Sequence, residues 1–333
     1  MADSQERLKA SIIVPSYEGA ERLEKTIPRL LNQKADAYEV IVVLDGPDPE
    51  SEKILKDFPE TGRLRWLIHP ENRGRAAALN TGFKAAKGAV LIRCDDDLLT
   101  TAHFITAHLM AHEQAREETR LVGVVGQVTN RFVEETSWSR FQSKLDRKAS
   151  DARLAARDNL PFVYWAANCS VSRQTFDCVG HYDESFVKYG WEDIEWGYRL
   201  VKAGGKLVFC PESDAMHMIF ADSFEKRCLR LYESGVAKRH FLTLHPEAEQ
   251  SMKIDEKRAV QRSGLKALLR SFFWFMVHRF LTEDTRFHQS DALRKARSWL
   301  KASETKLPQK LLFISYQIIL ELHARAGEKT DLK

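Results

Sequence analysis

Residues 11–15 read SIIVP, residues 40–46 read VIVVLDG, and residues 89–97 read AVLIRCDDD. Each segment is a run of aliphatic and β-branched residues that ends at a turn former or at charged residues, which is typical of a buried strand. Between these runs, apolar residues recur at helical spacing. The alternation predicts an α/β, Rossmann-like fold with a mainly parallel sheet flanked by helices. Strands are expected over residues 11–14, 40–44, 63–68, 89–92 and 121–128, and helices over residues 21–31 and 75–86.

The pattern changes near residue 222, where strand-like runs give way to charged helical patterns. We therefore expect one domain over residues 1–221 and a helical C-terminal extension over residues 222–333. Basic residues outnumber acidic ones in the extension, and the reverse holds before it. Residues 265–280 place apolar and basic side chains at helical spacing. Such a helix packs on the first domain or on a second subunit, or it lies on an anionic membrane surface.

Composition excludes several classes of protein. With 44% hydrophobic and 29% charged residues, the chain forms a core and is not disordered or of low complexity. Its 5 cysteines lie far apart without a CxxC pair, which argues against a disulfide framework and a structural zinc site. Residues 1–10 lack the apolar segment of a secretory signal, and the longest apolar runs are too short to span a membrane. We expect a cytoplasmic protein, in peripheral contact with a membrane if the basic extension binds one, and no nucleic-acid partner.

Three adjacent carboxylates follow the run at residues 89–92. Asp95, Asp96 and Asp97 repel one another, and near a core their charge is costly unless a cation offsets it. Carboxylate oxygens suit Mg²⁺ or Mn²⁺. In an extended segment, Asp95 and Asp97 would point the same way and Asp96 elsewhere. The alternative is a solvated helix N-terminus, in which Asp97 caps a helix that begins near Thr100.

A second acidic group, Glu192 and Asp193, lies between Trp191 and Trp196. A desolvated carboxylate in this setting can take a proton from an acceptor hydroxyl, and a tryptophan can stack on a sugar ring. The alternative is a helix N-terminus with acidic residues in its first turn and tryptophans in the core. His217 lies among apolar residues, where a histidine is commonly a hydrogen-bonded core residue.

Motifs run in a fixed order through most of the chain. They are Ile12-Ile13-Val14-Pro15-Ser16-Tyr17, Val42-Val43-Leu44-Asp45-Gly46, Asn72-Arg73-Gly74, Asn80-Thr81-Gly82, Asp95-Asp96-Asp97, Asn168-Cys169-Ser170, Gly180-His181-Tyr182-Asp183-Glu184 and Trp191-Glu192-Asp193, with a histidine closing the series. Over roughly residues 10–220, this set resembles glycosyltransferase family 2, whose members are inverting enzymes of GT-A fold. The family often writes its metal motif Asp-x-Asp-Asp, whereas Cys94 precedes the triplet here, so the ligating aspartates remain open.

The resemblance implies a function and a set of site residues. The expected reaction moves a sugar from a UDP- or GDP-sugar to a hydroxyl of a saccharide, a lipid-linked acceptor or a small molecule, as in polysaccharide synthesis. Asp193, with Glu192 beside it, would be the catalytic base. Asp95, Asp97 and His217 would hold Mn²⁺ or Mg²⁺, and Trp191 and Asn168 would contact the acceptor. The nucleotide-sugar side chains would be Pro15, Ser16, Tyr17, Glu18, Asp45, Asn72, Arg75 and Asp96.

Two other classes of protein fit parts of the pattern. A sugar nucleotidyltransferase usually has a Gly- and Lys/Arg-rich loop after its first strand, whereas residues 15–19 read PSYEG without a basic residue. A non-catalytic binding protein of the same fold has no need of a base, yet both acidic groups are present. Neither a G-x-S-x-G nucleophile motif nor a P-loop occurs in the chain. The residues therefore favour a glycosyltransferase.

Overall fold

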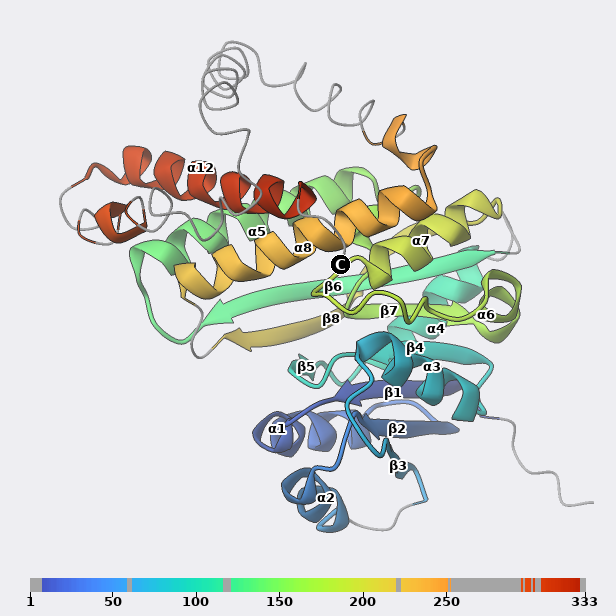
Figure 1. The fold of residues 1–333 in the computed structure, drawn as a ribbon. Coiled ribbons are helices and arrows are strands. Elements are labelled where there is room, and N and C mark those ends of the chain that lie inside the picture. The colour runs from blue at the N-terminus through green and yellow to red at the C-terminus, as the bar shows by residue number, and fades with distance from the viewer. Residues whose placement is uncertain are drawn as a thin grey trace, which may run out of the picture. The chain divides into compact units, whose positions relative to one another are not determined.

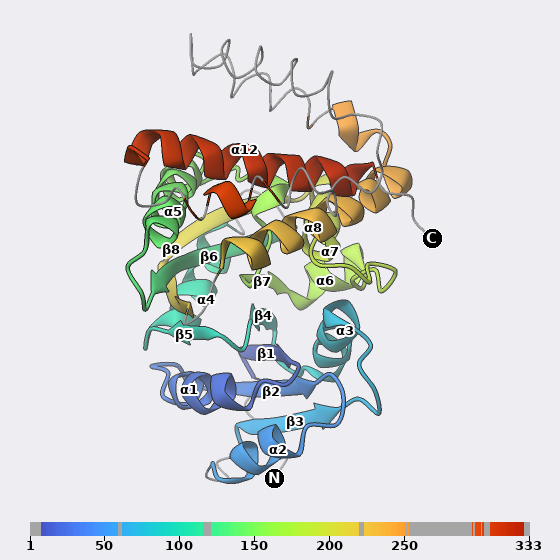
Figure 2. The ribbon, with the colours of Figure 1, turned by 60° about the vertical axis from the view of Figure 1, so that its left-hand side comes forward.

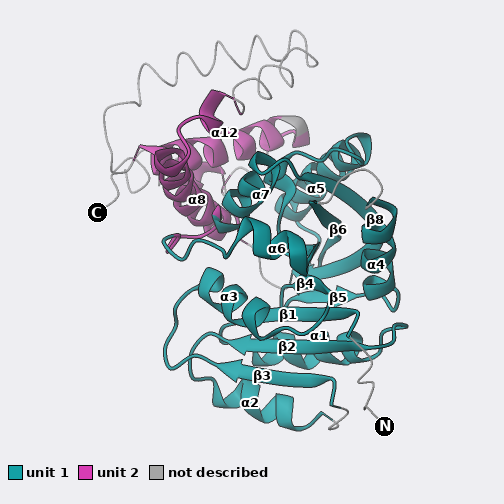
Figure 3. Ribbon diagram, turned by 90° about the vertical axis from the view of Figure 1, so that its right-hand side faces the viewer, with its two compact units in different colours: residues 1–185, 192–221 teal, residues 186–191, 222–333 magenta. Residues whose placement is uncertain are grey.

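The computed structural model describes residues 8–58, 62–115, 121–219, 223–250, 252, 295, 297–300, 302 and 307–329. The chain divides into two compact units (Figure 3). We call residues 1–185 with 192–221 the sheet unit, and residues 186–191 with 222–333 the helical unit. The amphipathic segment expected at 265–280 lies outside the described residues, and the domain division expected at residue 222 stays a prediction.

The sheet unit is built on one mixed sheet of eight strands in the order β3-β2-β1-β4-β7-β6-β8-β5 (Figure 1). Neighbours among β3, β2, β1 and β4 are parallel, as the sequence predicts. Beyond them, β7 is antiparallel to β4 and β6, β8 is parallel to β6, and β5 is antiparallel to β8. The strands are β1 (Ala10–Ser16), β2 (Tyr38–Leu44), β3 (Leu64–Ile68), β4 (Val90–Cys94), β5 (Leu98–Thr100), β6 (Val122–Phe132), β7 (Asn168–Ser172) and β8 (Lys206–Ile219).

Helices cover both faces of this sheet, and each face has its own hydrophobic core. Successive residues of β1 alternate between the cores: Ile13 packs with Leu79 and Phe83, whereas Ile12 belongs to the cluster of Leu23. Burial on both faces explains why the strand sequences are continuous apolar runs. The helices of this unit are α1 (Ala20–Leu31), α2 (Pro49–Lys56), α3 (Arg75–Ala85), α4 (Phe104–Ala115), α5 (Ser137–Ala155), α6 (Arg173–Val179) and α7 (Glu192–Lys202), with a 3₁₀ turn, η1 (Phe162–Tyr164).

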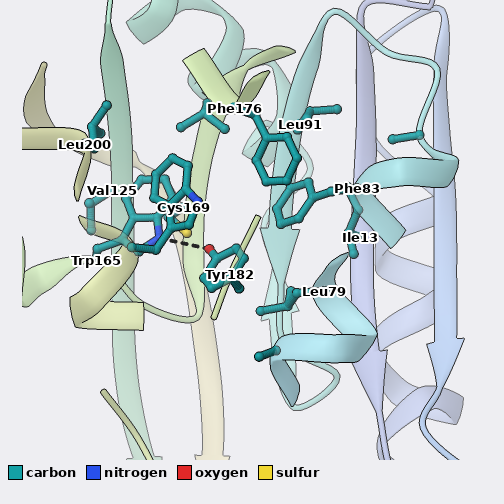
Figure 4. Close-up of a cluster of buried hydrophobic side chains, with 14 of the residues drawn as sticks. Ile13, Leu79, Phe83, Leu91, Val125, Trp165, Cys169, Phe176, Tyr182 and Leu200 are labelled. Atoms are coloured by element: carbon teal, nitrogen blue, oxygen red, sulfur yellow. Dashed lines mark hydrogen bonds between the residues drawn. The ribbon is translucent and has the colours of Figure 1, made fainter. Parts of the chain in front are cut away.

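Aromatic side chains fill much of the core that contains Ile13, which is the cluster drawn in Figure 4. Trp165 donates its indole N–H to the hydroxyl of Tyr182 at 2.9 Å and stacks on Trp196 with ring centroids 4.9 Å apart. Phe83 and Phe176 pack beside them. Trp196, which follows the second acidic group in the sequence, is therefore a core residue that anchors α7 to the sheet unit.

The helical unit contains α8 (Phe224–Leu244) and α12 (Gln309–Glu328), which lie side by side (Figure 2). Helices in the C-terminal third are thus as predicted. Lys238 Nζ contacts Glu328 Oε1 at 2.8 Å, and the rings of Phe224 and Tyr316 lie 5.0 Å apart. Within the described residues, no helix combines the length and the hydropathy that crossing a membrane requires.

The two helices approach most closely at a pair of glycines. A Cβ on Gly235 of α8 would collide with the carbonyl oxygen of Ala324, and one on Gly327 of α12 would collide with that of Tyr232. We expect Gly235→Ala to lower the free energy of unfolding by about 1–3 kcal/mol, because backbone atoms cannot yield as side chains do. At a helix position with open space, the same change would raise stability by up to about 1 kcal/mol. Urea denaturation measures the sign, and a stabilised variant would contradict the close packing.

Candidate active site

The carboxyl ends of parallel strands meet at one edge of the sheet, where ligands bind in folds of this kind. Ser16 ends β1, Asp45 follows β2, and Asp95 follows β4. Because β1 pairs with both β2 and β4, these three residues come to the same edge. The sheet thus brings to one edge three segments whose residues are predicted to bind the nucleotide sugar or the metal.

Asp45 organises the loop between β3 and α3. Its carboxylate accepts hydrogen bonds from His69 Nδ1 at 2.8 Å and from the backbone amides of Arg73 and Gly74 at 2.9 and 2.8 Å. The Asn72 side chain accepts a further bond from the Gly74 amide at 3.0 Å. Asp45 therefore fixes the loop that carries Asn72. The same bonds hold the residues directly before α3, the helix that begins at Arg75.

Asp96 points back into the loop that follows β1. Its carboxylate accepts a bond from Ser16 Oγ at 2.5 Å and a two-pronged contact from the Arg22 guanidinium at 2.9 and 3.0 Å. Burial raises the pKa of Asp96 above its ordinary value, and Arg22 opposes that shift. Arg22 also donates to the carbonyl oxygen of Tyr17, whose ring is 49% exposed. The four predicted nucleotide-binding residues 15–18, which form the end of β1 and the start of the loop after it, are thus held in place by Asp96 and Arg22, and Tyr17 is open to solvent.

The three aspartates do not lie in an extended segment, so the expected alternation of Asp95 and Asp97 is wrong. The amide of Leu98 bonds to the carbonyl of Asp95 at 3.2 Å, which closes a turn between β4 and β5. The alternative of a helix capped by Asp97 is also wrong, because residues 98–100 form β5. The turn directs the three carboxylates to three different sets of partners.

Asp95 belongs to a buried cluster of charges around Arg93. The Arg93 side chain is 1% exposed; it contacts Asp95 Oδ1 from Nε at 2.8 Å and Asp95 Oδ2 from Nη2 at 3.2 Å. Its Nη1 forms an ion pair with Asp193 Oδ1 at the start of α7. One buried guanidinium therefore joins the carboxylates of two motifs that lie about a hundred residues apart in the sequence.

Glu192 is the other carboxylate at the start of α7, so this acidic group is at a helix N-terminus, as the alternative proposed. Glu192 Oε1 lies 3.4 Å from Arg75 Nη1, while Oε2 is buried without a hydrogen-bond partner in the described part of the chain. Burial, with Asp193 beside it, raises the pKa of Glu192 to about 7. Its protonated form is therefore favoured compared with that of a glutamate in water.

Asp97 faces His217 across the pairing of β5 with β8. Asp97 Oδ2 and His217 Nε2 lie 3.2 Å apart, and both side chains are about one-third exposed. Burial acts to raise the pKa of Asp97, but the bond to His217 and the charges of Arg75 and Arg22 lower it below its ordinary value. Asp97 and His217 are therefore two potential metal ligands that solvent can reach.

The separation of these two atoms fits a divalent metal. Octahedral Mg²⁺ binds its ligands at about 2.1 Å, so neighbouring ligand atoms lie roughly 3.0 Å apart. No three His, Cys, Asp or Glu side chains of the described ranges gather as a complete metal site. A Mg²⁺ or Mn²⁺ ion held by only two protein ligands is ordinary, because these ions keep waters and bind substrate phosphates. The residues present therefore fit such an ion.

The side chains of the two predicted acceptor residues, Asn168 and Trp191, each have hydrogen-bond partners of their own. Asn168 is 2% exposed, and its amide group bonds to His108 Nε2 at 2.9 Å and to the carbonyls of Gln127 and Ser213 at 3.0 and 2.9 Å. Its side chain is therefore engaged inside the sheet unit, although its backbone pairs with Cys94, directly before Asp95; its contact with an acceptor stays a prediction. Trp191 belongs to the helical unit, where its indole N–H donates to Ser234 Oγ at 3.0 Å and its ring packs on Phe241.

Asn168 is part of a buried polar chain between α4 and the sheet. Its amide oxygen accepts from His108 Nε2, so His108 Nδ1 accepts from Ser170 Oγ, also at 2.9 Å, and His112 Nε2 lies 2.9 Å from the same hydroxyl. Complete burial lowers the pKa of His108 to about 3. His108 thus stays neutral in the folded protein.

This shift predicts a loss of stability in mild acid. The unfolded chain protonates His108 near pH 6.5 and the folded one only near pH 3, so stability present above pH 6.5 is lost as the pH falls. Between pH 7.5 and pH 5, the loss from this residue is about 2 kcal/mol. Urea denaturation of the wild type and of His108→Gln at both pH values isolates it, because the other histidines cancel in the comparison. An equal pH dependence in the two proteins would contradict the assignment.

The sequence is similar to those of known proteins. Residues 11–180, half of the chain, match the family model described as glycosyl transferase family 2. The chain belongs to this family. It is 27% identical over 242 residues to the uncharacterized glycosyltransferase YfnE of Bacillus subtilis, and 25% identical over 227 residues to a validoxylamine A glucosyltransferase of Streptomyces hygroscopicus subsp. jinggangensis. These matches cover 59% and 61% of this chain but only 61% and 54% of the relatives.

Solved structures confirm the GT-A fold expected for the family. The mannosyltransferase PcManGT from Pyrobaculum calidifontis, in complex with GDP-Man and Mn²⁺, matches 94% of this chain and 87% of its own, with a TM-score of 0.54 and 15% identity. GalNAc-T7 with UDP, GalNAc and Mn²⁺ matches 74% of this chain and 52% of its own, with a TM-score of 0.51 and 16% identity. Identities this low show the fold, and the chemistry must be argued from the side chains of this family 2 member.

Proposed function

We propose that the chain transfers a sugar from a nucleoside-diphosphate sugar to an acceptor hydroxyl with inversion, by metal-assisted single displacement. The observation that carries this proposal is the presence of two separate acidic groups in one unit. The solvent-open pair of Asp97 and His217 fits a divalent ion, and Asp193 lies at the start of α7 against Arg93. Family membership and relatives named as glycosyltransferases support it.

The donor would bind at the carboxyl ends of β1, β2 and β4. The loop with Tyr17 and Glu18, built on Pro15 and Ser16, offers an exposed ring and backbone groups to a nucleoside. Asp96 and Asp45 hold this loop and the neighbouring one, which carries Asn72, so their contribution to nucleotide binding is to shape the site. Arg75, 41% exposed at the start of α3, is placed to meet a phosphate charge.

Asp97 and His217 would hold Mn²⁺ or Mg²⁺, and the ion would offset the negative charge that develops on the departing diphosphate. Asp95 is the weaker candidate, because both of its oxygens already contact Arg93. The co-crystallised Mn²⁺ in two neighbours of the same fold is consistent with a divalent ion.

Asp193 would act as the base. As the acceptor oxygen attacks the anomeric carbon, its proton passes to the Asp193 carboxylate, the bond from carbon to the diphosphate oxygen breaks, and the electron pair leaves with the diphosphate. Arg93 holds Asp193 from the buried side and orients it. Glu192 beside it is the alternative base, with a pKa near 7 that suits proton transfer at neutral pH.

The acceptor is a saccharide, a lipid-linked glycan or a small molecule, with polysaccharide synthesis as the setting. A cytoplasmic location, with the helical unit in contact with a membrane surface or a second copy, belongs to the same proposal. The same carboxylate base would serve any of these acceptor hydroxyls. The first experiment therefore varies the donor.

The test measures the release of nucleoside diphosphate from a panel of UDP- and GDP-sugars in Mn²⁺, in Mg²⁺ and in EDTA. We expect one donor to be consumed slowly with water as acceptor in the presence of metal, and none in EDTA. Binding of a donor without any turnover, even with a library of acceptors, would favour a non-catalytic binding protein. Formation of a nucleotide sugar from a nucleoside triphosphate and a sugar phosphate would favour a nucleotidyltransferase.

A further inference from the structure

Strands β6 and β8, with the turn before β5, bring Asn130, His217 and Asp97 next to one another. Leu98 of β5 pairs with His217 of β8, so Asp97 approaches His217 from the turn just before β5. On the other side of β8, His217 pairs with Asn130 of β6. Side chains of paired residues in a sheet point to the same face. The register of the sheet therefore sets an amide beside the imidazole, opposite the carboxylate.

Hydrogen bonds fix the orientation of that amide. Asn130 Nδ2 donates to Asp146 Oδ2 of α5 at 3.0 Å, and only a nitrogen can donate to a carboxylate. The amide oxygen of Asn130 must then be the atom that lies 2.9 Å from His217 Nδ1. An amide oxygen only accepts, so Nδ1 carries the hydrogen. The other ring nitrogen, Nε2, faces Asp97 Oδ2 at 3.2 Å, so it is the nitrogen that can bind an ion beside that carboxylate once the ion takes the place of its hydrogen.

We propose that Asn130, held by Asp146, is a positioning residue that holds the hydrogen of His217 on Nδ1, fixes the orientation of the ring and so presents Nε2 beside Asp97 as a metal ligand. The inference rests on the proposed function for the identity of the bound group. Histidines that bind metals almost always donate their other N–H to an oxygen acceptor, and loss of that acceptor typically lowers metal affinity 10- to 100-fold. Nothing in the sequence motifs points to Asn130 or Asp146.

The tautomer is measured directly on the metal-free protein. Long-range ¹H–¹⁵N correlation spectra of ¹⁵N-histidine-labelled protein, recorded above pH 8, distinguish the protonated ring nitrogen from the unprotonated one, and His217→Gln assigns the signal. We expect Nδ1–H in the wild type and a shift towards Nε2–H in Asn130→Leu, which removes the acceptor. An Nε2–H tautomer in the wild type would overturn the inference.

Metal affinity is measured by Mn²⁺ titration with electron paramagnetic resonance, without donor or acceptor. We expect Asn130→Leu to bind Mn²⁺ about 10- to 100-fold more weakly than the wild type. The matched control is Ser150→Ala, which removes another bond between α5 and β6, from Ser150 Oγ to Gln127 Oε1 at 3.3 Å, and should bind normally.

A swapped pair separates positioning from simple damage to the fold. Asn130→Asp alone places two carboxylates together and should weaken Mn²⁺ binding, whereas Asn130→Asp combined with Asp146→Asn restores the bond in the reverse direction and should recover it. If His217→Ala loses Mn²⁺ binding while Asn130→Leu binds Mn²⁺ as the wild type does, the role of Asn130 is overturned and the metal site stands. Unchanged Mn²⁺ binding in His217→Ala would instead overturn the metal site of the proposed function.

Discussion

Asp193→Asn is expected to lower turnover by about 10³-fold and to leave the donor dissociation constant within a factor of about two. General bases contribute roughly 10²- to 10⁴-fold, and the base acts on the acceptor rather than on the nucleotide sugar. An asparagine keeps the shape and the contact with Arg93 but cannot take a proton. Single-turnover measurements with saturating donor read this loss directly.

The neighbouring carboxylate provides the control for Asp193. Glu192→Gln keeps the size of the side chain beside Arg75 and removes an ionisable group whose pKa burial raises. We expect a smaller loss of turnover in this variant. If Asp193→Asn keeps near-normal turnover and Glu192→Gln does not, the two carboxylates exchange their roles. Unfolding curves of both variants show whether the Arg93 cluster has survived.

Asp97→Asn is expected to weaken Mn²⁺-dependent donor binding and to lower turnover by at least about 100-fold. Removal of outer-shell groups already costs about 10- to 100-fold in metal affinity, and a ligand counts for more. Asp95→Asn is the matched comparison: it lies in the same turn, but its oxygens contact Arg93. We expect Asp95→Asn to affect Mn²⁺ binding less than Asp97→Asn does. Unchanged donor binding in both variants would contradict a metal site at the turn.

Much of the fold could be predicted from the sequence, because strands buried on both faces must be apolar. Residues 40–44 are predicted as a strand and lie within β2, and the helix predicted at 75–86 is α3, one residue shorter. The directions of the later strands could not be predicted. The antiparallel direction of β7 depends on which strands accept its hydrogen bonds, and a short apolar run carries no information about that.

The acidic residues of the site and Arg75 could be predicted from the sequence, whereas Arg93 could not. Adjacent carboxylates beside apolar segments are costly unless a partner offsets their charge, so the groups that contain Asp97 and Asp193 stand out in the sequence. Arg93 lies inside a strand, and the partners of its guanidinium, Asp95 and Asp193, meet only in three dimensions. An arginine within an otherwise apolar strand, separated from a group of aspartates by the single residue Cys94, is the signal that could have found it.

The turn at residues 95–98 shows why the directions of the three aspartate side chains could not be predicted from the sequence. Alternation predicts side-chain direction only in an extended segment, and one backbone bond from the Leu98 amide to the Asp95 carbonyl removes that condition. In the sequence, Arg22 stands out only as the first basic residue after β1, and nothing there shows that it contacts Asp96. Its bond to Asp96 requires α1 to lie over the end of β4.

We propose that a nucleoside diphosphate binds this chain through a divalent ion held by Asp97 and His217. Isothermal titration of UDP and of GDP into the wild type, with Mn²⁺ and with EDTA, tests this most directly, with Asp97→Asn and His217→Ala alongside. We expect that one nucleotide binds in Mn²⁺, that EDTA abolishes the binding, and that both variants weaken it at least about tenfold. Binding of equal strength in EDTA, or in both variants, would contradict a metal site at these two residues.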